Sequence, residues 1–324
     1  MAEASAAVHS ALSQRKETTM TIALKQVAQE PDAPGPDWYQ RAVSQEAASH
    51  YVEVNSNRLH YLAWNAHDAD KPALLFVHGF RAHARWWDFI APFFTATHRV
   101  FAMDLSGMGD SGWRESYSSQ QLAGDVSGFI QELGLGAATV VAHSYGGLCT
   151  LRAAAERPDL FKHVIVIDTY VVFEGAVLPR DPARITGSRI YPDYASARAR
   201  YRLMPEQPTP TPCLVDHVAR HSLRAVEGGL RWKFDGRLQE PETHAHDGEA
   251  MLRKIAAPVD YIYGECSALI DEQHVRRITN ALPNVRGPIP IPDGHHHLML
   301  DQPIALISTL RALLCENKSG NQAE

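Results

Sequence analysis

Residues 139–147 read TVVAHSYGG, and this stretch decides how the 324-residue chain folds. Its apolar first half predicts a buried strand, and the segment 145–156, which ends before a proline, predicts a helix. A serine on a sharp strand-to-helix turn needs small residues two positions before and two after it, because the backbone there leaves no room for side chains. Ala142 and Gly146 meet this requirement. Ser144 is therefore the candidate nucleophile.

Apolar segments on both sides of this turn extend the pattern. Strands are predicted for YVEV at 51–54, RLHYLAW at 58–64, ALLFVH at 73–78, RVFAMD at 99–104 and HVIVID at 163–168. Helices are predicted for about 83–94 and 119–133 between them. Apolar strands that alternate with helices indicate an α/β fold, with a mostly parallel central sheet and helices on both faces. Ligands of such sheets bind beyond the carboxyl ends of the strands.

The strand and helix pattern breaks in two places. Residues 1–48 are rich in Ala, Ser, Gln and Pro, and a proline-rich stretch of about 75 residues follows Asp168. Strands at 258–264 and 285–291 and helices at about 271–281 and 301–315 then resume the sheet pattern. We expect a mobile N-terminal lead-in (1–48), a core (49–170 and 246–316), a helical cap inserted after the sixth strand (171–245) and a C-terminal tail (317–324). The alternative for the lead-in is that Trp38, Tyr39 and Val43 dock on the domain body.

Three further motifs occur at the ends of predicted strands or before a predicted helix. His78-Gly79-Phe80 comes after the third strand, Asp104 to Ser111 after the fourth, and Gly294 to His297 before Leu-Met-Leu-Asp-Gln-Pro. Together with Ser144 they resemble the α/β-hydrolase superfamily, in particular esterase-like serine hydrolases with a cap, over about residues 51–315. The resemblance implies an α/β-hydrolase core and an oxyanion hole.

The oxyanion hole would consist of two backbone N–H groups, those of Phe80 and Tyr145. The usual first glycine of the nucleophile motif is alanine here, at position 142.

The resemblance also indicates the general base. In this family a glycine commonly precedes the catalytic histidine and a proline follows it by seven residues, and Pro303 then indicates His296. Pro292, which precedes His296 by four residues, gives the same assignment. His295 is the alternative, because motif alignment leaves the register of a loop open.

The acid that orients the histidine is less clearly marked. The family most often places it after the seventh strand, where this chain reads Gly264-Glu-Cys-Ser267, a serine. Some members carry it at the end of the sixth strand, where Asp168 stands. Asp168 is therefore the expected acid, and Glu265 and Asp271 remain alternatives.

These residues suit acyl transfer: Ser144 attacks a carbonyl, His296 accepts its proton, and water hydrolyses the acyl-enzyme. A serine nucleophile disfavours the dehalogenation and epoxide opening that this fold performs with an aspartate. The leading hypothesis is hydrolysis of a carboxylic ester or lactone. Alternatives are carbon–carbon bond hydrolysis of a vinylogous diketone, a low-turnover ligand receptor, and a cofactor-free oxygenase or perhydrolase.

Composition narrows the remaining possibilities. The formal net charge is -6, with 31 basic and 37 acidic residues spread along the chain, so nucleic acid is not an expected partner. The four cysteines lie far apart, which predicts no metal site, no disulfide framework and a cytoplasmic location. No apolar run is long enough for a membrane helix. We expect a small-molecule substrate, no cofactor and possible homo-oligomers.

Overall fold

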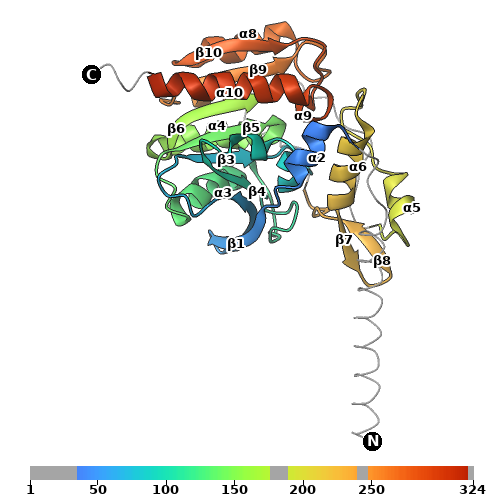
Figure 1. Cartoon of the computed structure of the whole chain (residues 1–324). Helices are drawn as coiled ribbons and strands as arrows, with labels where there is room; N and C mark the ends of the chain where they lie inside the picture. The colour runs from blue at the N-terminus through green and yellow to red at the C-terminus, as the bar shows by residue number, and fades with distance from the viewer. Residues whose placement is uncertain (1–34, 176–188, 239–246, 320–324) are drawn as a thin grey trace, which may run out of the picture.

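An eight-stranded sheet forms the centre of the computed structural model, which describes residues 35–175, 189–238 and 247–319 (Figure 1). The strand order is β1-β2-β4-β3-β5-β6-β9-β10. The bounds are β1 (Ala48–Val54), β2 (Asn57–Trp64), β3 (Ala73–Val77), β4 (Arg99–Met103), β5 (Ala138–His143), β6 (Phe161–Ile167), β9 (Val259–Gly264) and β10 (Val285–Ile291). Within this sheet of the described residues, the β1–β2 and β2–β4 pairs are antiparallel and the other pairs are parallel. The predicted mostly parallel sheet is confirmed.

Helices cover both faces of this sheet. One face packs against α3 (Ser119–Glu132), α4 (Ser144–Glu156), α7 (Gly248–Leu252) and α8 (Glu272–Ala281). The other packs against η1 (Ala84–Trp87), η2 (Ala91–Phe94), α9 (Leu298–Asp301) and α10 (Pro303–Ser319). A short turn, η3 (Pro158–Leu160), precedes β6. Alternate side chains of β3 enter the two cores: Leu75 and Val77 face one, and Leu74 and Phe76 the other.

The structure corrects two element predictions in the core. Residues 83–94 form two short 3₁₀ turns instead of one helix, and Pro92, which lacks an N–H donor, lies in the second. The last helix runs to Ser319, so the tail expected from residue 317 begins later than predicted. None of the described helices is both long enough and apolar enough to cross a bilayer.

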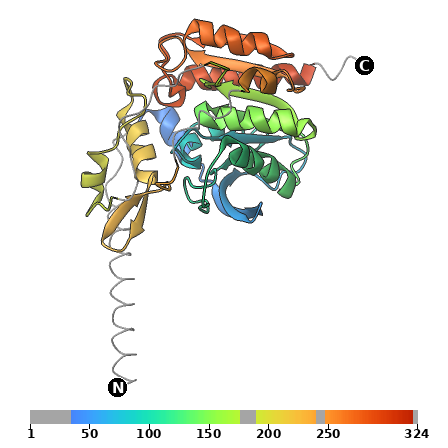
Figure 2. The same ribbon diagram turned by 180° about the vertical axis from the view of Figure 1, so that it is seen from behind.

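The inserted segment lies beside the core (Figures 1 and 2). Its described elements are α5 (Tyr194–Arg198), α6 (Pro212–His221), β7 (Leu223–Val226) and β8 (Gly229–Trp232). The cap contains helices, as predicted, and also an antiparallel hairpin of β7 and β8 that was not predicted. Gly228, with φ of +88°, permits its tight turn.

The two ends of the cap are joined to each other. The N–H of Gly248 donates to the carbonyl of Val172 over 3.1 Å, at the positions where the chain leaves and re-enters the core. Arg152 of α4 forms a bidentate pair with Asp247 next to this point, at 2.8 and 3.0 Å. The insertion therefore begins and ends at one fixed place.

Part of the expected lead-in is ordered. Residues Asp37–Val43 form the helix α2, which lies between core and cap (Figure 1). Tyr39 is buried there, and its hydroxyl hydrogen-bonds Nδ1 of His217 in α6 at 3.1 Å. The described part of the lead-in thus follows the alternative in which Trp38, Tyr39 and Val43 dock on the domain body; residues 1–34 lie outside the described part of the chain.

Histidines fix the cap to the core. His217 bonds Asp88 at 3.0 Å, and Nε2 of His83 lies 2.9 Å from the hydroxyl of Ser222 at the end of α6. Burial lowers the pKa of His83 to about 3, so its ring is neutral at pH 7. These contacts hold α6 against the η1 region of the core.

Asp104 organises the loop after β4. Its carboxylate accepts hydrogen bonds from Nδ1 of His60 at 2.7 Å, from the Ala84 N–H at 2.6 Å and from the Asp110 N–H at 2.8 Å. Burial alone would raise the pKa of Asp104, but the hydrogen bond and the charge of His60 bring it well below its ordinary value.

We expect Asp104→Asn to cost about 3 to 5 kcal/mol of unfolding free energy at pH 7, because it breaks a buried pair. A carboxyl with a lowered folded pKa stabilises the fold above its unfolded pKa of about 3.9, and this contribution is lost as the pH falls further. Urea unfolding at pH 7 and at about pH 3.5 should therefore give a difference between wild type and variant that narrows in acid. Asp70→Asn, at an exposed position, is the control; an equal loss at both pH values would contradict the assignment.

Candidate active site

Ser144 occupies the turn between β5 and α4 in a strained backbone conformation. Its φ is +53°, which an L-residue rarely adopts. A Cβ at Gly146 would strike the carbonyl oxygen of His78, and a Cβ at Gly147 would overlap the side chain of Thr169. Only glycine fits at these positions, so the turn closes tightly and Ser144 lies at the carboxyl end of the central strand.

The loop after β3 lies next to this turn. Because the Leu105 N–H donates to Nε2 of His78 at 3.1 Å, the ring proton sits on Nδ1 and is donated to the carbonyl of Gly79 at 2.7 Å. Burial lowers the pKa of His78, in accord with a neutral ring. The ring of Phe80 meets the ring of Tyr145 edge to face at 5.5 Å. The segments that carry the two expected oxyanion N–H groups are thus adjacent.

His296 and Asp168 form a buried pair. Nδ1 of His296 lies 2.7 Å from a carboxylate oxygen of Asp168, and both side chains are almost fully buried. Asp168 follows β6 with a φ of +46°, so its backbone is strained like that of Ser144. A carboxylate bound to Nδ1 holds the proton there and leaves Nε2 as the basic nitrogen.

Two further donors hold the carboxylate of Asp168. The Gly264 N–H donates to one oxygen at 2.9 Å, and the hydroxyl of Ser267 donates to the other at 2.7 Å. That second oxygen is the one that His296 contacts. The serine that stands where the family most often has its acid therefore binds the carboxylate supplied by the neighbouring strand.

The alternative residues have other contacts. Nδ1 of His295 and its backbone N–H both bond Asp301, at 2.9 and 2.7 Å. Asp271 caps α8 by accepting from the His274 N–H at 2.7 Å. Glu265 is exposed. None of these three side chains has a described contact with His296.

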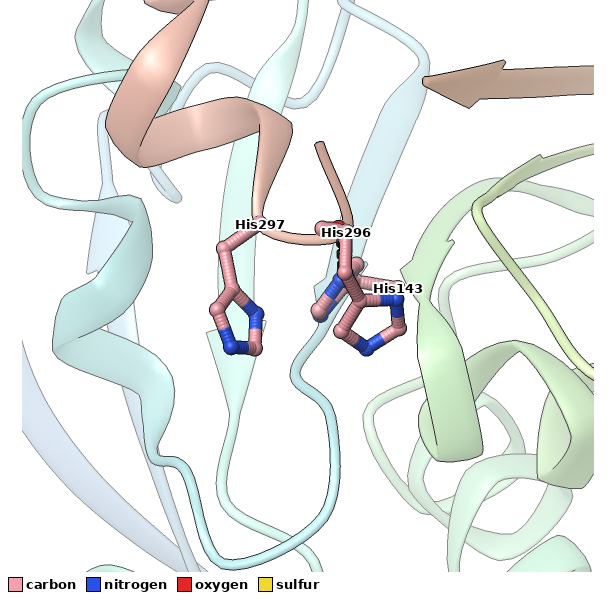
Figure 3. Close-up of side chains that lie close together, drawn as sticks. All are labelled: His143, His296 and His297. Carbon is pink, nitrogen blue, oxygen red and sulfur yellow. Dashed lines mark hydrogen bonds between the residues drawn. The ribbon is translucent and has the colours of Figure 1, made fainter. Parts of the chain in front are cut away.

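Three histidine rings gather at the site (Figure 3). Nε2 of His143 donates to the carbonyl of His296 at 2.9 Å, and the two ring centres lie 4.7 Å apart. The ring centre of His297 lies 4.7 Å from that of His296 and 5.3 Å from that of Trp86. Burial and the neighbouring His296 lower the pKa of both His143 and His297. His143 thereby fixes the backbone of the histidine loop while remaining neutral.

The same three rings could hold a cation. One potential ligand nitrogen from each of His143, His296 and His297 lies within 4.8 Å of the others. Neutral imidazoles are good ligands for zinc-like ions. Such an ion would compete with the use of His296 as a general base.

Comparison with known proteins assigns the fold to a family. A family model described as the alpha/beta hydrolase fold matches residues 72–303, most of the chain. The chain belongs to this family. The match begins just before β3 and ends at the start of α10, and it includes the Ser144 turn, Asp168 and the histidine loop of the α/β-hydrolase.

Individual relatives are hydrolases. The chain is 26% identical to Esterase Rv0045c of Mycobacterium tuberculosis (strain ATCC 25618 / H37Rv), covering 81% of this chain and 88% of that one. It is also 26% identical to the 2-(acetamidomethylene)succinate hydrolase of Mesorhizobium japonicum, covering 70% and 81%. A crystal structure of E-2-(acetamidomethylene)succinate hydrolase superposes with a TM-score of 0.72 at 24% identity, covering 83% and 99%. These relatives support a hydrolase on the α/β-hydrolase fold.

Proposed function

We propose that this protein is a serine hydrolase that cleaves a carboxylic ester or lactone of a small molecule through an acyl-enzyme on Ser144. The observation that carries the proposal is the 2.7 Å contact between His296 Nδ1 and Asp168, in a chain whose Ser144 is held at positive φ after β5. Strained backbone and a buried histidine–carboxylate pair are expensive to maintain, and they recur together where a hydroxyl must be made nucleophilic.

In the proposed mechanism Ser144 attacks the substrate carbonyl and His296 accepts its proton on Nε2. Asp168 keeps the ring in the required tautomer and stabilises the imidazolium that forms. The N–H groups of Phe80 and Tyr145 bind the negative oxygen of the tetrahedral intermediate. His296 then returns the proton to the leaving alcohol, and a water molecule deprotonated by His296 releases the acid and restores Ser144.

The named activities of the relatives agree with hydrolysis of a carbonyl compound, one as an esterase and the other as a hydrolase of an acetamidomethylene succinate. We propose an ester or lactone because Ser144 matches acyl transfer. Carbon–carbon bond hydrolysis and ligand binding with slow turnover remain outcomes of the tests.

The first test is labelling by a fluorophosphonate probe with mass-spectrometric mapping, together with turnover of short-chain p-nitrophenyl esters. We expect the label on Ser144 and measurable turnover. An unlabelled, inert Ser144 would contradict the proposal and favour a receptor. Labelling without ester turnover would lead to a panel of vinylogous diketones.

Treatment with a chelator distinguishes hydrolysis by a serine nucleophile from hydrolysis by a metal ion bound to the three histidines. We expect EDTA to leave ester turnover within about twofold, because no step of the acyl-enzyme path needs a cation. A large loss that Zn²⁺ restores would contradict the proposal and assign hydrolysis to a metal-bound water. A non-chelating buffer salt of equal ionic strength is the control.

A further inference from the structure

A cavity lies where the core meets the cap hairpin. Its volume is about 370 Å³, and its walls come from the β1–β2 hairpin, the loop after β4 and the β7–β8 hairpin. The lining side chains used below are Tyr51, Arg58, Asp110, Trp113, Arg224 and Arg231. They are different residues from those of the candidate active site.

Two of its arginines face each other across the hairpin. Arg224 and Arg231 are directly opposite in the β7–β8 ladder. Like charges in this relation destabilise a hairpin. Arg224 donates to the carbonyl of Gly109 at 2.5 Å, but the Nε atoms of both arginines are buried without a hydrogen-bond partner in the described residues. A buried donor without an acceptor is costly, and an anion beside the pair would offset part of that cost through its charge.

The acid in the cavity wall is already engaged. Asp110 pairs with Nζ of Lys233 at 2.7 Å. Burial and the charge of Arg231 lower the pKa of Arg224, although Asp110 opposes this. Arg58 adds a third guanidinium to the wall. Cationic charge is therefore in excess at this surface.

Aromatic rings hold the guanidinium groups in position. Arg58 lies over the ring of Tyr51 at 3.7 Å. Arg224 and Arg231 lie 5.7 and 5.1 Å from the ring of Trp113. Trp113 is 36% exposed and Tyr51 45%, more than most large apolar side chains of this chain. Stacking of this kind orients arginines without using their N–H donors.

We propose that this cavity binds an organic oxyanion, a phosphate ester or a carboxylate, through Arg58, Arg224 and Arg231. Guanidinium groups bind both kinds of anion through paired N–H donors. The volume lies in the range of small-molecule sites and exceeds what a lone inorganic ion needs. A bound anion would relieve the repulsion across the hairpin and fix the hairpin to the core.

The test is calorimetric titration of the full chain carrying Ser144→Ala with pyrophosphate and, separately, with citrate. Because this background lacks the proposed nucleophile, the result does not depend on the proposed function. We expect saturable binding of at least one probe, weakened about tenfold or more by Arg231→Gln. Arg276→Gln removes the same charge at an exposed position on α8 and should change the dissociation constant less than about twofold.

The outcomes are distinct. Tighter binding of pyrophosphate indicates a phosphate ester, and tighter binding of citrate indicates a carboxylate. Absence of saturable binding of both probes up to about 10 mM would overturn the proposal. Equal weakening by Arg231→Gln and Arg276→Gln would also overturn it, since it would reflect net charge alone. Circular dichroism of each variant excludes loss of fold, and Arg231→Lys, which keeps the charge but not the paired donors, should bind with intermediate strength.

Discussion

Ser144→Ala is expected to lower kcat for ester hydrolysis by about 10⁴-fold or more, because the variant has no atom that can form the acyl-enzyme. The strained turn stays closed, since Gly146 and Gly147 remain in contact with His78 and Thr169. Folding is therefore retained, and the loss is confined to chemistry. Steady-state kinetics and circular dichroism check the two halves of this prediction.

The matched control is Ser116→Ala, which removes an exposed hydroxyl. It should keep wild-type kcat and wild-type labelling by the fluorophosphonate. If Ser144→Ala kept more than about a tenth of the activity, Ser144 would not be the nucleophile.

Asp168→Asn is expected to lower kcat roughly 10³- to 10⁴-fold, because an amide cannot stabilise the imidazolium and favours the wrong ring tautomer. The hydroxyl of Ser267 and Nδ1 of His296 both contact Oδ1 of Asp168. A carboxylate at position 267 would therefore approach Nδ1 of His296 from the loop after the neighbouring strand. The double variant Asp168→Asn with Ser267→Asp should therefore recover part of the activity. Pre-steady-state kinetics with a p-nitrophenyl ester measures the recovery at the acylation step.

Glu265→Gln and Asp271→Asn are the controls for this acid. Both should keep kcat within about twofold, although Asp271→Asn alters the cap of α8 and could cost up to about 1 kcal/mol of stability. Full activity in Asp168→Asn, with a loss in either control, would transfer the orienting role to that residue.

Much of the core could be predicted from sequence because its signals are local. The apolar strands β3, β5 and β6 are uninterrupted, and the helix after Ser144 ends before a proline. These patterns depend only on residues that are close in the sequence, so they predict the elements without knowledge of tertiary contacts. The cap hairpin was missed because its strands have four residues each and lie in a proline-rich segment. The helix α2 was missed because its anchor, His217, is 178 residues away in the chain.

The site shows the same division. Ser144, His296 and Asp168 could be selected by motif and spacing, and the structure brings His296 and Asp168 into contact. The bond from Ser267 to Asp168 depends on the adjacency of β6 and β9, which the intervening cap hides in the sequence. The contact of His143 with the histidine loop likewise joins residues 153 positions apart. The contact between Ser267 and Asp168 had one signal in the sequence, which was the serine at the position where the family most often has its acid.

The hydrogen bond between Gly248 and Val172 has a consequence for how this enzyme can diversify. The bond joins the two ends of the cap beside the paired strands β6 and β9. Lengthening the segment between Val172 and Gly248 therefore adds a loop-closure entropy cost that grows only slowly with its length. The machinery around Ser144 is held by the sheet and does not need to be rebuilt each time. Exchange of this segment between homologues, with Val172 and Gly248 retained, is therefore expected to leave the fold of the core intact.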